Sequence, residues 1–253
     1  MLTTQYVPGS VCMIDYGSPD VPATAAFYSG TLGWSHHPVG EGYGFFEVDG
    51  KQVAGLGRLT EEGATPAWMV YFHTADTDAT AKAVEQAGGT VRVPPEDVMT
   101  EGRTAQFTDP AGAEFAVWQP GDFRGLGMVT EPGSLGWVEL YVADPAAIQA
   151  FYRSVFVWRI EDMPMGDLSY PVISPAEGDE QSGQGGIVQL QPGDRAHWLP
   201  YFEVPDCDAA AARAQDLGGT VRVPAGDIEG VGRMAFLSDP HGAPFAIITS
   251  TTP

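Results

Sequence analysis

The chain has 253 residues, of which 43% are hydrophobic, and it carries a formal net charge of −21 at pH 7. Because 33 Asp and Glu face only 12 Lys and Arg, a phosphate backbone or an anionic membrane surface would be repelled, so we expect neither nucleic acid nor membrane as a partner. The two cysteines are too few for a disulfide framework, and no apolar run reaches the length of a membrane span. These features predict a cytoplasmic protein with an acidic, solubilising surface.

The first half of the chain predicts strands and helices in a regular order. The alternating stretch 11–16 is typical of a strand, and Asp20 is a suitable N-cap for a helix that ends at Gly33. Two short strands, 44–49 and 52–59, meet at the turn dipeptide Asp49-Gly50. The cycle then starts again with five further elements: a strand at 68–72, a helix from Asp76 or Asp78 to 87, and strands at 90–93, 103–108 and 114–118.

The second half repeats this plan after a break in the pattern. Residues 121–135 are rich in Gly, Pro and charge without periodicity, which is typical of a linker. We therefore predict a first domain over 1–120, a linker over 121–135 and a second domain over 136–253. The elements of the second domain follow in the same order: a strand at 136–142, a helix from Asp144, a strand at 198–204, a helix from Asp206 or Asp208, and a last strand at 243–249.

The two halves are copies of one another. Gly-Gly-Thr-Val-Arg-Val-Pro occurs at 88–94 and again at 218–224, an offset of 130 residues. Earlier in each half the offset is 124, so six residues are inserted in the second half, and we place them in the polar run 174–184. The sequence thus predicts an α+β protein, a tandem duplication in which each half pairs two βαβββ modules.

Three motifs carry a resemblance to a known family. Phe-Tyr lies on the first helix of each half (Phe27-Tyr28 and Phe151-Tyr152), a Trp follows that helix, and an Asp-Pro-x-Gly turn precedes the last strand. This plan resembles the vicinal oxygen chelate superfamily of glyoxalases, extradiol dioxygenases and bleomycin resistance proteins. Its duplicated form is similar to the two-domain glyoxalase-like or hydroxylase type of actinobacteria. The resemblance implies four modules that build two cup-shaped mixed β-sheets with flanking helices.

The resemblance also says where a metal should bind. Metal-using members carry a His, Gln or Glu on the first strand of each module and a Glu on the last strand of each half. The matching side chains here are all apolar: Met13, Met69, Ala116, Trp137, Leu199 and Ala246. Such side chains do not bind a hard or borderline cation, so we predict no metal and no cofactor at the usual place. A divalent metal at a relocated site, around His73 with Asp15 or Glu47, is the alternative.

Side chains two residues farther along the first strands face the same side of the sheet. They are Asp15, Tyr71, Glu139 and Tyr201, so each half offers one carboxylate and one phenol to its cup. Such a pair can orient a ligand's hydroxyl or carbonyl, act as acid and base with Asp15 or Glu139 as the catalytic group, or simply close the sheet as a satisfied polar pair. The same parity predicts four further ligand-binding residues: His73, Glu114, Trp118 and Trp137. Trp118 and Trp137 are either flat walls for an aromatic ligand or core residues.

Three functions remain open at this point. The first is metal-independent binding of a small apolar or aromatic molecule, a natural product or antibiotic, for resistance or sequestration. The second is a superfamily enzyme, a lyase, isomerase, oxygenase or hydroxylase-like tailoring step of secondary metabolism, with a relocated metal or metal-free acid–base chemistry. In the third, only one half is functional. In each case the partner is a small molecule, and we expect a monomer or a homodimer.

Overall fold

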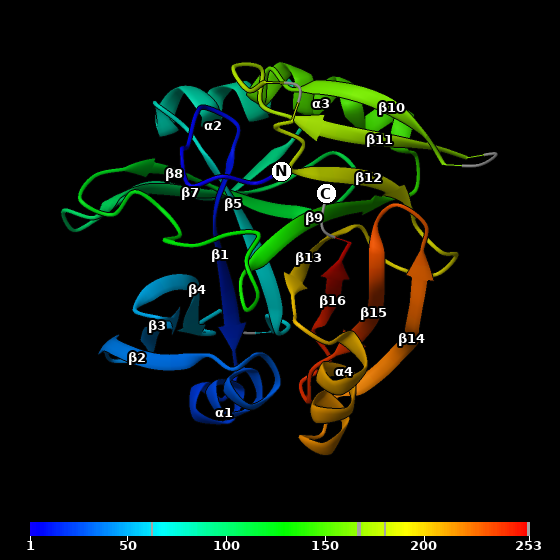
Figure 1. Ribbon diagram of the computed structural model, residues 1–253. Coiled ribbons are helices and arrows are strands. Elements are labelled where there is room, and N and C mark those ends of the chain that lie inside the picture. The colour runs from blue at the N-terminus through cyan, green and yellow to red at the C-terminus, as the bar shows by residue number, and fades with distance from the viewer. Residues whose placement is uncertain (62, 166–167, 180, 252–253) are drawn as a thin grey trace. The chain divides into compact units, whose positions relative to one another are not determined.

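The computed structural model describes residues 1–61, 63–165, 168–179 and 181–251 (Figure 1). The first module consists of β1 (Val11–Ser18), α1 (Val21–Leu32), β2 (Ser35–Gly40), β3 (Tyr43–Val48) and β4 (Lys51–Arg58). The second consists of β5 (Ala67–His73), α2 (Thr77–Gln86), β6 (Thr90–Val98), β7 (Gly102–Thr108) and β8 (Glu114–Pro120). Both modules therefore have the predicted order βαβββ.

The second half of the chain repeats that order. Its first module consists of β9 (Leu135–Val142), α3 (Pro145–Phe156), β10 (Arg159–Met165), β11 (Leu168–Ser174) and β12 (Gly185–Gln189). Its second consists of β13 (His197–Glu203), α4 (Cys207–Asp216), β14 (Thr220–Ile228), β15 (Gly232–Ser238) and β16 (Pro244–Ser250). Residue 180, within the run 174–184 where the insertion is predicted, lies outside the described residues.

The strands form two mixed sheets of eight strands with the same order. One sheet runs β2-β3-β4-β1-β5-β8-β7-β6, and the other runs β10-β11-β12-β9-β13-β16-β15-β14. In each module the first strand pairs in parallel with the last, as β1 does with β4 and β9 with β12. The predicted fold class, an α+β tandem duplication of paired modules, is confirmed.

The helices begin at the aspartates that the sequence offers as caps. Asp20, Asp76, Asp144 and Asp206 are the N-caps, and each side chain accepts a hydrogen bond from a backbone N–H of the first turn. Asp76 and Asp206 are thus the caps rather than Asp78 and Asp208. The two latter carboxylates instead pair with Arg103 and Arg233. No helix of the described residues is long and apolar enough to cross a membrane.

Two strand assignments differ from the prediction. β2 was not anticipated from the sequence, because Pro38 and Gly40 interrupt it and most of its side chains are exposed. β6 continues through Pro94 and Pro95 to Val98, and its register against β7 shifts between Val93 and Glu96. Such a bulge accommodates prolines that cannot donate to the ladder.

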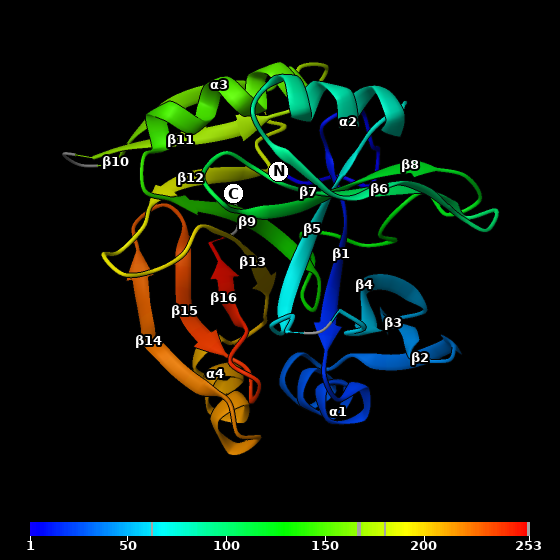
Figure 2. The same cartoon turned by 180° about the vertical axis from the view of Figure 1, so that it is seen from behind.

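The chain divides into two compact units that do not follow the duplication. The first unit is Met1–Met13, Met69–Gly125 and Val138–Trp198, and the second is Ile14–Trp68, Leu126–Trp137 and Leu199–Pro253. Each unit therefore combines one module from each half of the chain. Helices α2 and α3 pack together in the first unit, and α1 and α4 in the second (Figure 2).

The same aromatic network forms the core of each unit. In the first unit the Tyr152 hydroxyl donates to Asp109 Oδ2 at 2.9 Å, and the Trp198 indole N–H donates to the Tyr152 oxygen at 3.2 Å. Burial raises the pKa of both the Tyr152 phenol and the Asp109 carboxyl. The Phe-Tyr motif of one half thus reaches the Asp-Pro-x-Gly turn of the other half. These groups are structural.

The second unit repeats the network with Tyr28 donating to Asp239 Oδ2 at 3.1 Å and Trp68 donating to Tyr28 at 3.0 Å. Trp34 and Trp158, the tryptophans that follow the first helix of each half, are each 3% exposed and lie in the core. The Trp34 indole N–H donates to the Gly133 carbonyl, so part of the segment predicted as a linker is held against the second unit. Leu126 and Val129 of that segment are also buried.

Candidate functional site

A carboxylate and a phenol meet in the second unit, and we call this group the Asp15 cluster (Asp15, Tyr43 and Gly55). Asp15 on β1 pairs with Gly55 on β4, and Gly55 pairs in turn with Phe45 on β3. Tyr43, two residues before Phe45, points its side chain to the same face as Phe45, and its hydroxyl donates to Asp15 Oδ1 at 3.0 Å. A Cβ atom at Gly55 would collide with both polar groups, so the cluster requires glycine there.

The first unit contains the equivalent group, the Glu139 cluster (Glu139, Tyr141, Tyr170, Gly186 and His197). Glu139 on β9 pairs with Gly186 on β12, as Asp15 pairs with Gly55. The Tyr170 hydroxyl on β11 donates to Glu139 Oε1 at 2.6 Å, and the Tyr141 hydroxyl donates to Oε2 at 2.8 Å. A Cβ atom at Gly186 would collide with the Tyr170 phenol.

An aromatic stack completes the Glu139 cluster. The His197 ring lies parallel to the Tyr141 ring, with 5.1 Å between centroids and 5° between planes. Nδ1 of His197 lies 2.9 Å from the carbonyl oxygen of Arg195, which orients the imidazole. Both rings are half-buried, so they present polarised edges and a flat surface to a ligand.

The chemistry of the Glu139 cluster follows from its geometry. Glu139 is 8% exposed, and each of its carboxylate oxygens accepts a hydrogen bond from a phenol. Hydrogen bonds to an ionised acceptor are short and strong, and they hold the carboxylate and both phenols in fixed positions. A phenol oxygen that donates its proton to a carboxylate keeps lone pairs for a ligand's O–H. The cluster can therefore orient a hydroxyl, or accept a proton at the carboxylate.

The structure does not test the predicted pairs Asp15 with Tyr71 and Glu139 with Tyr201. Asp15 and Tyr201 belong to the second unit, whereas Tyr71 and Glu139 belong to the first. Tyr71 is 7% exposed and Tyr201 is 3% exposed. Their roles stay predictions, as does that of Trp137, which is half-buried.

Trp118 and Glu114 on β8 have contacts that the sequence did not reveal. Trp118 is 4% exposed, and its indole N–H donates to the Phe123 carbonyl at 2.9 Å. This contact is what a core residue makes. The Glu114 carboxylate forms an ion pair with Arg92 at 2.7 Å and is half exposed. Neither residue belongs to the Asp15 or the Glu139 cluster, and their role as ligand contacts stays a prediction.

The phenols of Tyr43, Tyr141 and Tyr170 were missed by sequence reasoning. Two signals could have revealed them. The first is the presence of Gly55 and Gly186, each in the interior of a strand, where glycine marks a close approach of other groups. The second signal is the alternation of side chains, which puts Tyr141 on the same face of β9 as Glu139. Neither signal identifies which residue of the neighbouring hairpin bonds to the carboxylate.

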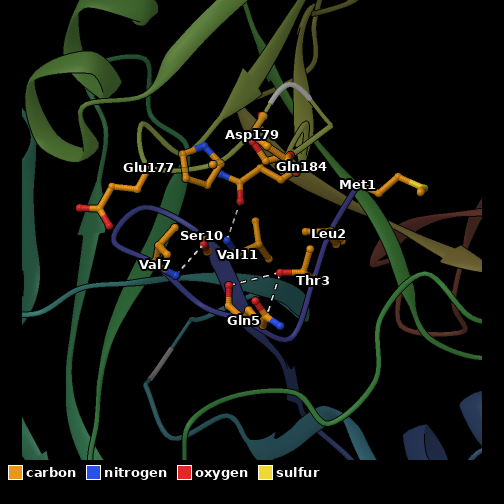
Figure 3. Close-up of a pocket in the computed structure, with 13 residues that line it drawn as sticks. Met1, Leu2, Thr3, Gln5, Val7, Ser10, Val11, Glu177, Asp179 and Gln184 are labelled. Carbon is orange, nitrogen blue, oxygen red and sulfur yellow. Dashed lines mark hydrogen bonds between the residues drawn. The ribbon is translucent and has the colours of Figure 1, made fainter.

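A cavity of about 330 Å³ lies between the N-terminal segment and residues 175–184 (Figure 3). The Gln184 side chain holds these two segments together, because its Oε1 accepts from the Val11 N–H and its Nε2 donates to the Gly9 carbonyl, both at 2.8 Å. The cavity therefore adjoins the region where the second half has its insertion. Both the amide oxygen and the amide nitrogen of the Gln184 side chain take part in this contact, which makes it structural.

Comparison with known families decides the classification of the chain. The model of the Glyoxalase/Bleomycin resistance protein/Dioxygenase superfamily matches residues 12–117, and that of a glyoxalase-like domain matches residues 137–248. The chain belongs to this superfamily. The resemblance read from its Phe-Tyr and Asp-Pro-x-Gly motifs is confirmed.

Relatives in the superfamily match nearly the whole chain. It is 39% identical over 267 aligned residues to the anthracycline biosynthesis protein DauV of Streptomyces sp. (strain C5), covering 97% of this chain and 94% of the relative. It is equally similar, at 39%, to the anthracycline biosynthesis protein DnrV of Streptomyces peucetius, with the same coverage.

Solved structures share the fold. A Mn(II)-bound glyoxalase from Novosphingobium aromaticivorans superposes with a TM-score of 0.68 at 18% identity, covering 96% of this chain and 82% of that one. The 2,2',3-trihydroxybiphenyl 1,2-dioxygenase of Sphingomonas wittichii strain RW1 also gives 0.68, at 15% identity, covering 96% of this chain and 91% of that one.

The side chains at the superfamily's usual ligand positions do not fit a metal ion. Met13 and Met69 lie on β1 and β5, and the other four positions also carry apolar groups on first or last strands. Over the described part of the chain, no three His, Cys, Asp or Glu side chains gather as ligands. Glu47, a member of the relocated set, lies 3.6 Å from His37.

Proposed function

We propose that this protein binds a small aromatic natural product in secondary metabolism without a metal, and that the Glu139 cluster holds the ligand's hydroxyl or carbonyl groups. The observation that carries the proposal is the pair of phenols hydrogen-bonded to both oxygens of the Glu139 carboxylate. The flat Tyr141–His197 stack beside them suits an aromatic ring. The anthracycline biosynthesis proteins DauV and DnrV, which are 39% identical to this chain, support a biosynthetic setting.

The metal-free part of the proposal has its own support. A carboxylate whose two oxygens already accept from Tyr141 and Tyr170 has fewer lone pairs for a cation. The six apolar side chains at the usual ligand positions offer no oxygen or nitrogen donor. Hydrogen bonding by the phenols therefore takes the place that a metal has in other members of the superfamily.

Tryptophan fluorescence tests the proposal, because the chain contains six Trp residues. We expect a hydroxylated anthraquinone to quench the emission saturably, and Glu139→Gln and Tyr170→Phe to raise the Kd at least tenfold. The matched control is Asp78→Asn, which removes an exposed surface carboxylate paired with Arg103 and should leave the Kd unchanged. EDTA should have no effect. Absence of saturable quenching, or binding that EDTA abolishes and added Mn²⁺ restores, would contradict the proposal.

A second candidate function is metal-free acid–base catalysis with Glu139 as the base. Its buried position and fixed orientation favour this role, since a general base must be held within hydrogen-bonding reach of the proton it removes. The test is deuterium exchange from D₂O into the carbon next to the carbonyl of an aromatic ketone, followed by mass spectrometry. Exchange by the wild type that is lost in Glu139→Gln supports catalysis. If the rate of exchange does not exceed the rate without protein for any ketone of a panel, catalysis is contradicted and ligand binding is the remaining function.

A further inference from the structure

A second cavity, of about 540 Å³, lies in the first unit between the N-terminal segment and the residues that follow β8. Its volume is within the range of small-molecule sites. No member of the Asp15 or Glu139 cluster lines it. The lining residues are Thr4, Gln5, Tyr6, Val7, His73, Pro120, Gly121 and Arg124.

The His73 ring is a hydrogen-bond donor toward this cavity. Burial lowers the pKa of His73, so the imidazole is neutral at pH 7. Its Nδ1 atom is fully enclosed and has no partner, whereas Nε2 is not enclosed in this way. An enclosed N–H without an acceptor is rarer and more costly than an enclosed lone pair. We therefore assign the ring proton to Nε2.

Arg124 brings a positive charge to the same cavity. Its side chain is exposed and forms no ion pair or hydrogen bond with any residue that the structure describes. By contrast, Arg92, Arg103 and Arg233 each pair with an acidic side chain. In a chain with net charge −21, an arginine that lines a cavity and pairs with no acidic side chain of the described residues has its five donors available to a ligand.

The backbone around the cavity is held in place. The His73 N–H donates to the Ser10 carbonyl at 2.7 Å, and the His73 carbonyl accepts from the Gly9 N–H at 2.9 Å. Gly125, next to Arg124, has φ +136°, and a Cβ atom there would lie 2.6 Å from the Cys12 carbonyl oxygen and 2.7 Å from the Tyr6 ring. Glycine is required for this close passage, which fixes the start of the Arg124 side chain.

We propose that this cavity binds a small organic carboxylate, with the guanidinium of Arg124 on its two oxygens and Nε2–H of His73 as a further donor. The planar fork of Arg matches a carboxylate in a bidentate manner. The site provides one positive charge, and neither Lys51 nor Lys82 lines it, so a monoanion is favoured over a phosphate dianion. The Tyr6 ring and Pro120 give the organic part of the ligand an apolar wall.

Calorimetric titration with benzoate, benzamide and inorganic phosphate tests the site independently of the Glu139 cluster. We expect benzoate to bind at least tenfold more tightly than benzamide or phosphate. Arg124→Gln should weaken benzoate binding at least tenfold and erase the preference over benzamide. His73→Phe should weaken benzoate binding severalfold, and His73→Gln, which restores an N–H donor, should recover part of the loss.

The control is Arg58→Gln, because Arg58 is another exposed arginine without an ion pair among the described residues but does not line this cavity. It should leave benzoate binding unchanged, and circular dichroism should show that every variant is folded. Three outcomes overturn the proposal: no benzoate binding by the wild type, equal affinity for benzoate and benzamide, or phosphate binding more tightly. Equal losses in Arg124→Gln and Arg58→Gln also overturn it, because they indicate a general charge effect.

Discussion

The Asp15 and Glu139 clusters occupy equivalent places in the duplicated fold, yet they differ at the position two residues after the carboxylate. Asp15 accepts from Tyr43, and Glu139 accepts from both Tyr170 and Tyr141. The position that matches Tyr141 in the first half is Gly17, two residues after Asp15. A Cβ atom at Gly17 would lie 2.7 Å from the Leu59 side chain, so the apolar Leu59 occupies that space.

A second difference accompanies the first. His197, whose ring stacks on Tyr141, corresponds to Ala67 at the start of β5. The second half therefore has a phenol and an imidazole where the first half has a glycine and an alanine. The shared frame is one acid, one phenol and one glycine on neighbouring strands, and the added rings distinguish the Glu139 cluster. This difference is the reason why we propose the Glu139 cluster, rather than the Asp15 cluster, as the ligand site.

The largest expected effect comes from removing the carboxylates. Glu139→Ala should lower the free energy of unfolding by about 3 kcal/mol, because it deprives two phenols of a charged acceptor. Asp15→Ala should lower it by about 1.5 kcal/mol, because the Tyr43 phenol loses its carboxylate acceptor. Urea denaturation measures both. Equal losses in the two variants would show that the second phenol on Glu139 adds nothing to stability.

The glycines should behave alike in the two clusters, since both lie against polar side chains. Gly186→Ala and Gly55→Ala should each cost about 2 kcal/mol, because the new methyl group displaces the phenol or the carboxyl. Gly226→Ala and Gly40→Ala are matched strand controls, because a Cβ atom there meets nothing within 4 Å. Thermal unfolding of the four variants checks this, and equal shifts in test and control variants would contradict the steric argument.

Tyr141→Phe converts the Glu139 cluster toward the composition of the Asp15 cluster. We expect this change alone to cost about 1 kcal/mol, since Glu139 keeps its bond to Tyr170. In the Tyr141→Phe background, Glu139→Ala should then cost about as much as Asp15→Ala costs in the wild type. A double-mutant cycle measured in urea gives the coupling energy, and a coupling near zero would mean that the two groups act independently.

The smallest expected effect concerns the stacked imidazole. His197→Ala, which places the residue of the first half at this position, should cost about 0.5 kcal/mol, because both rings are half-buried and stacking adds little beyond burial. Its effect on ligand affinity should be larger than on stability, because the proposed aromatic ligand loses a wall. Fluorescence titration of the variant measures the change in ligand affinity, and urea denaturation measures the change in stability. An unchanged Kd would exclude His197 from the binding surface.

The local structure could be read from the sequence to a large extent. Asp20 and Gly33 delimit α1 as expected, with Gly33 at φ +78°. The Asp49-Gly50 turn also forms, with both residues at positive φ. These features depend on a few neighbouring residues, so short-range rules suffice. The sequence did not predict β2, because most of its side chains are exposed and the strand forms through its pairing with β3.

The candidate site was only partly accessible from the sequence. Strand parity put Asp15 and Glu139 at equivalent positions of β1 and β9, where they pair with Gly55 and Gly186; their role in a site stays a prediction. Their phenol partners Tyr43 and Tyr170 come from another strand of the same module, and the register of β3 and β11 decides which phenol reaches the acid. A one-residue change of register would put each tyrosine on the opposite face, and the sequence does not specify that register without the tertiary pairing.

What the sequence determined by itself was the duplication, the order of elements in each module and the superfamily, because these depend on repeated motifs and local periodicity. The tertiary structure decided that each compact unit combines modules from both halves, since that pairing buries Tyr152 against Asp109 and Tyr28 against Asp239. It also decided which phenols meet Asp15 and Glu139. Hydrogen bonds between residues distant in the chain depend on packing and register, and no local pattern encodes them.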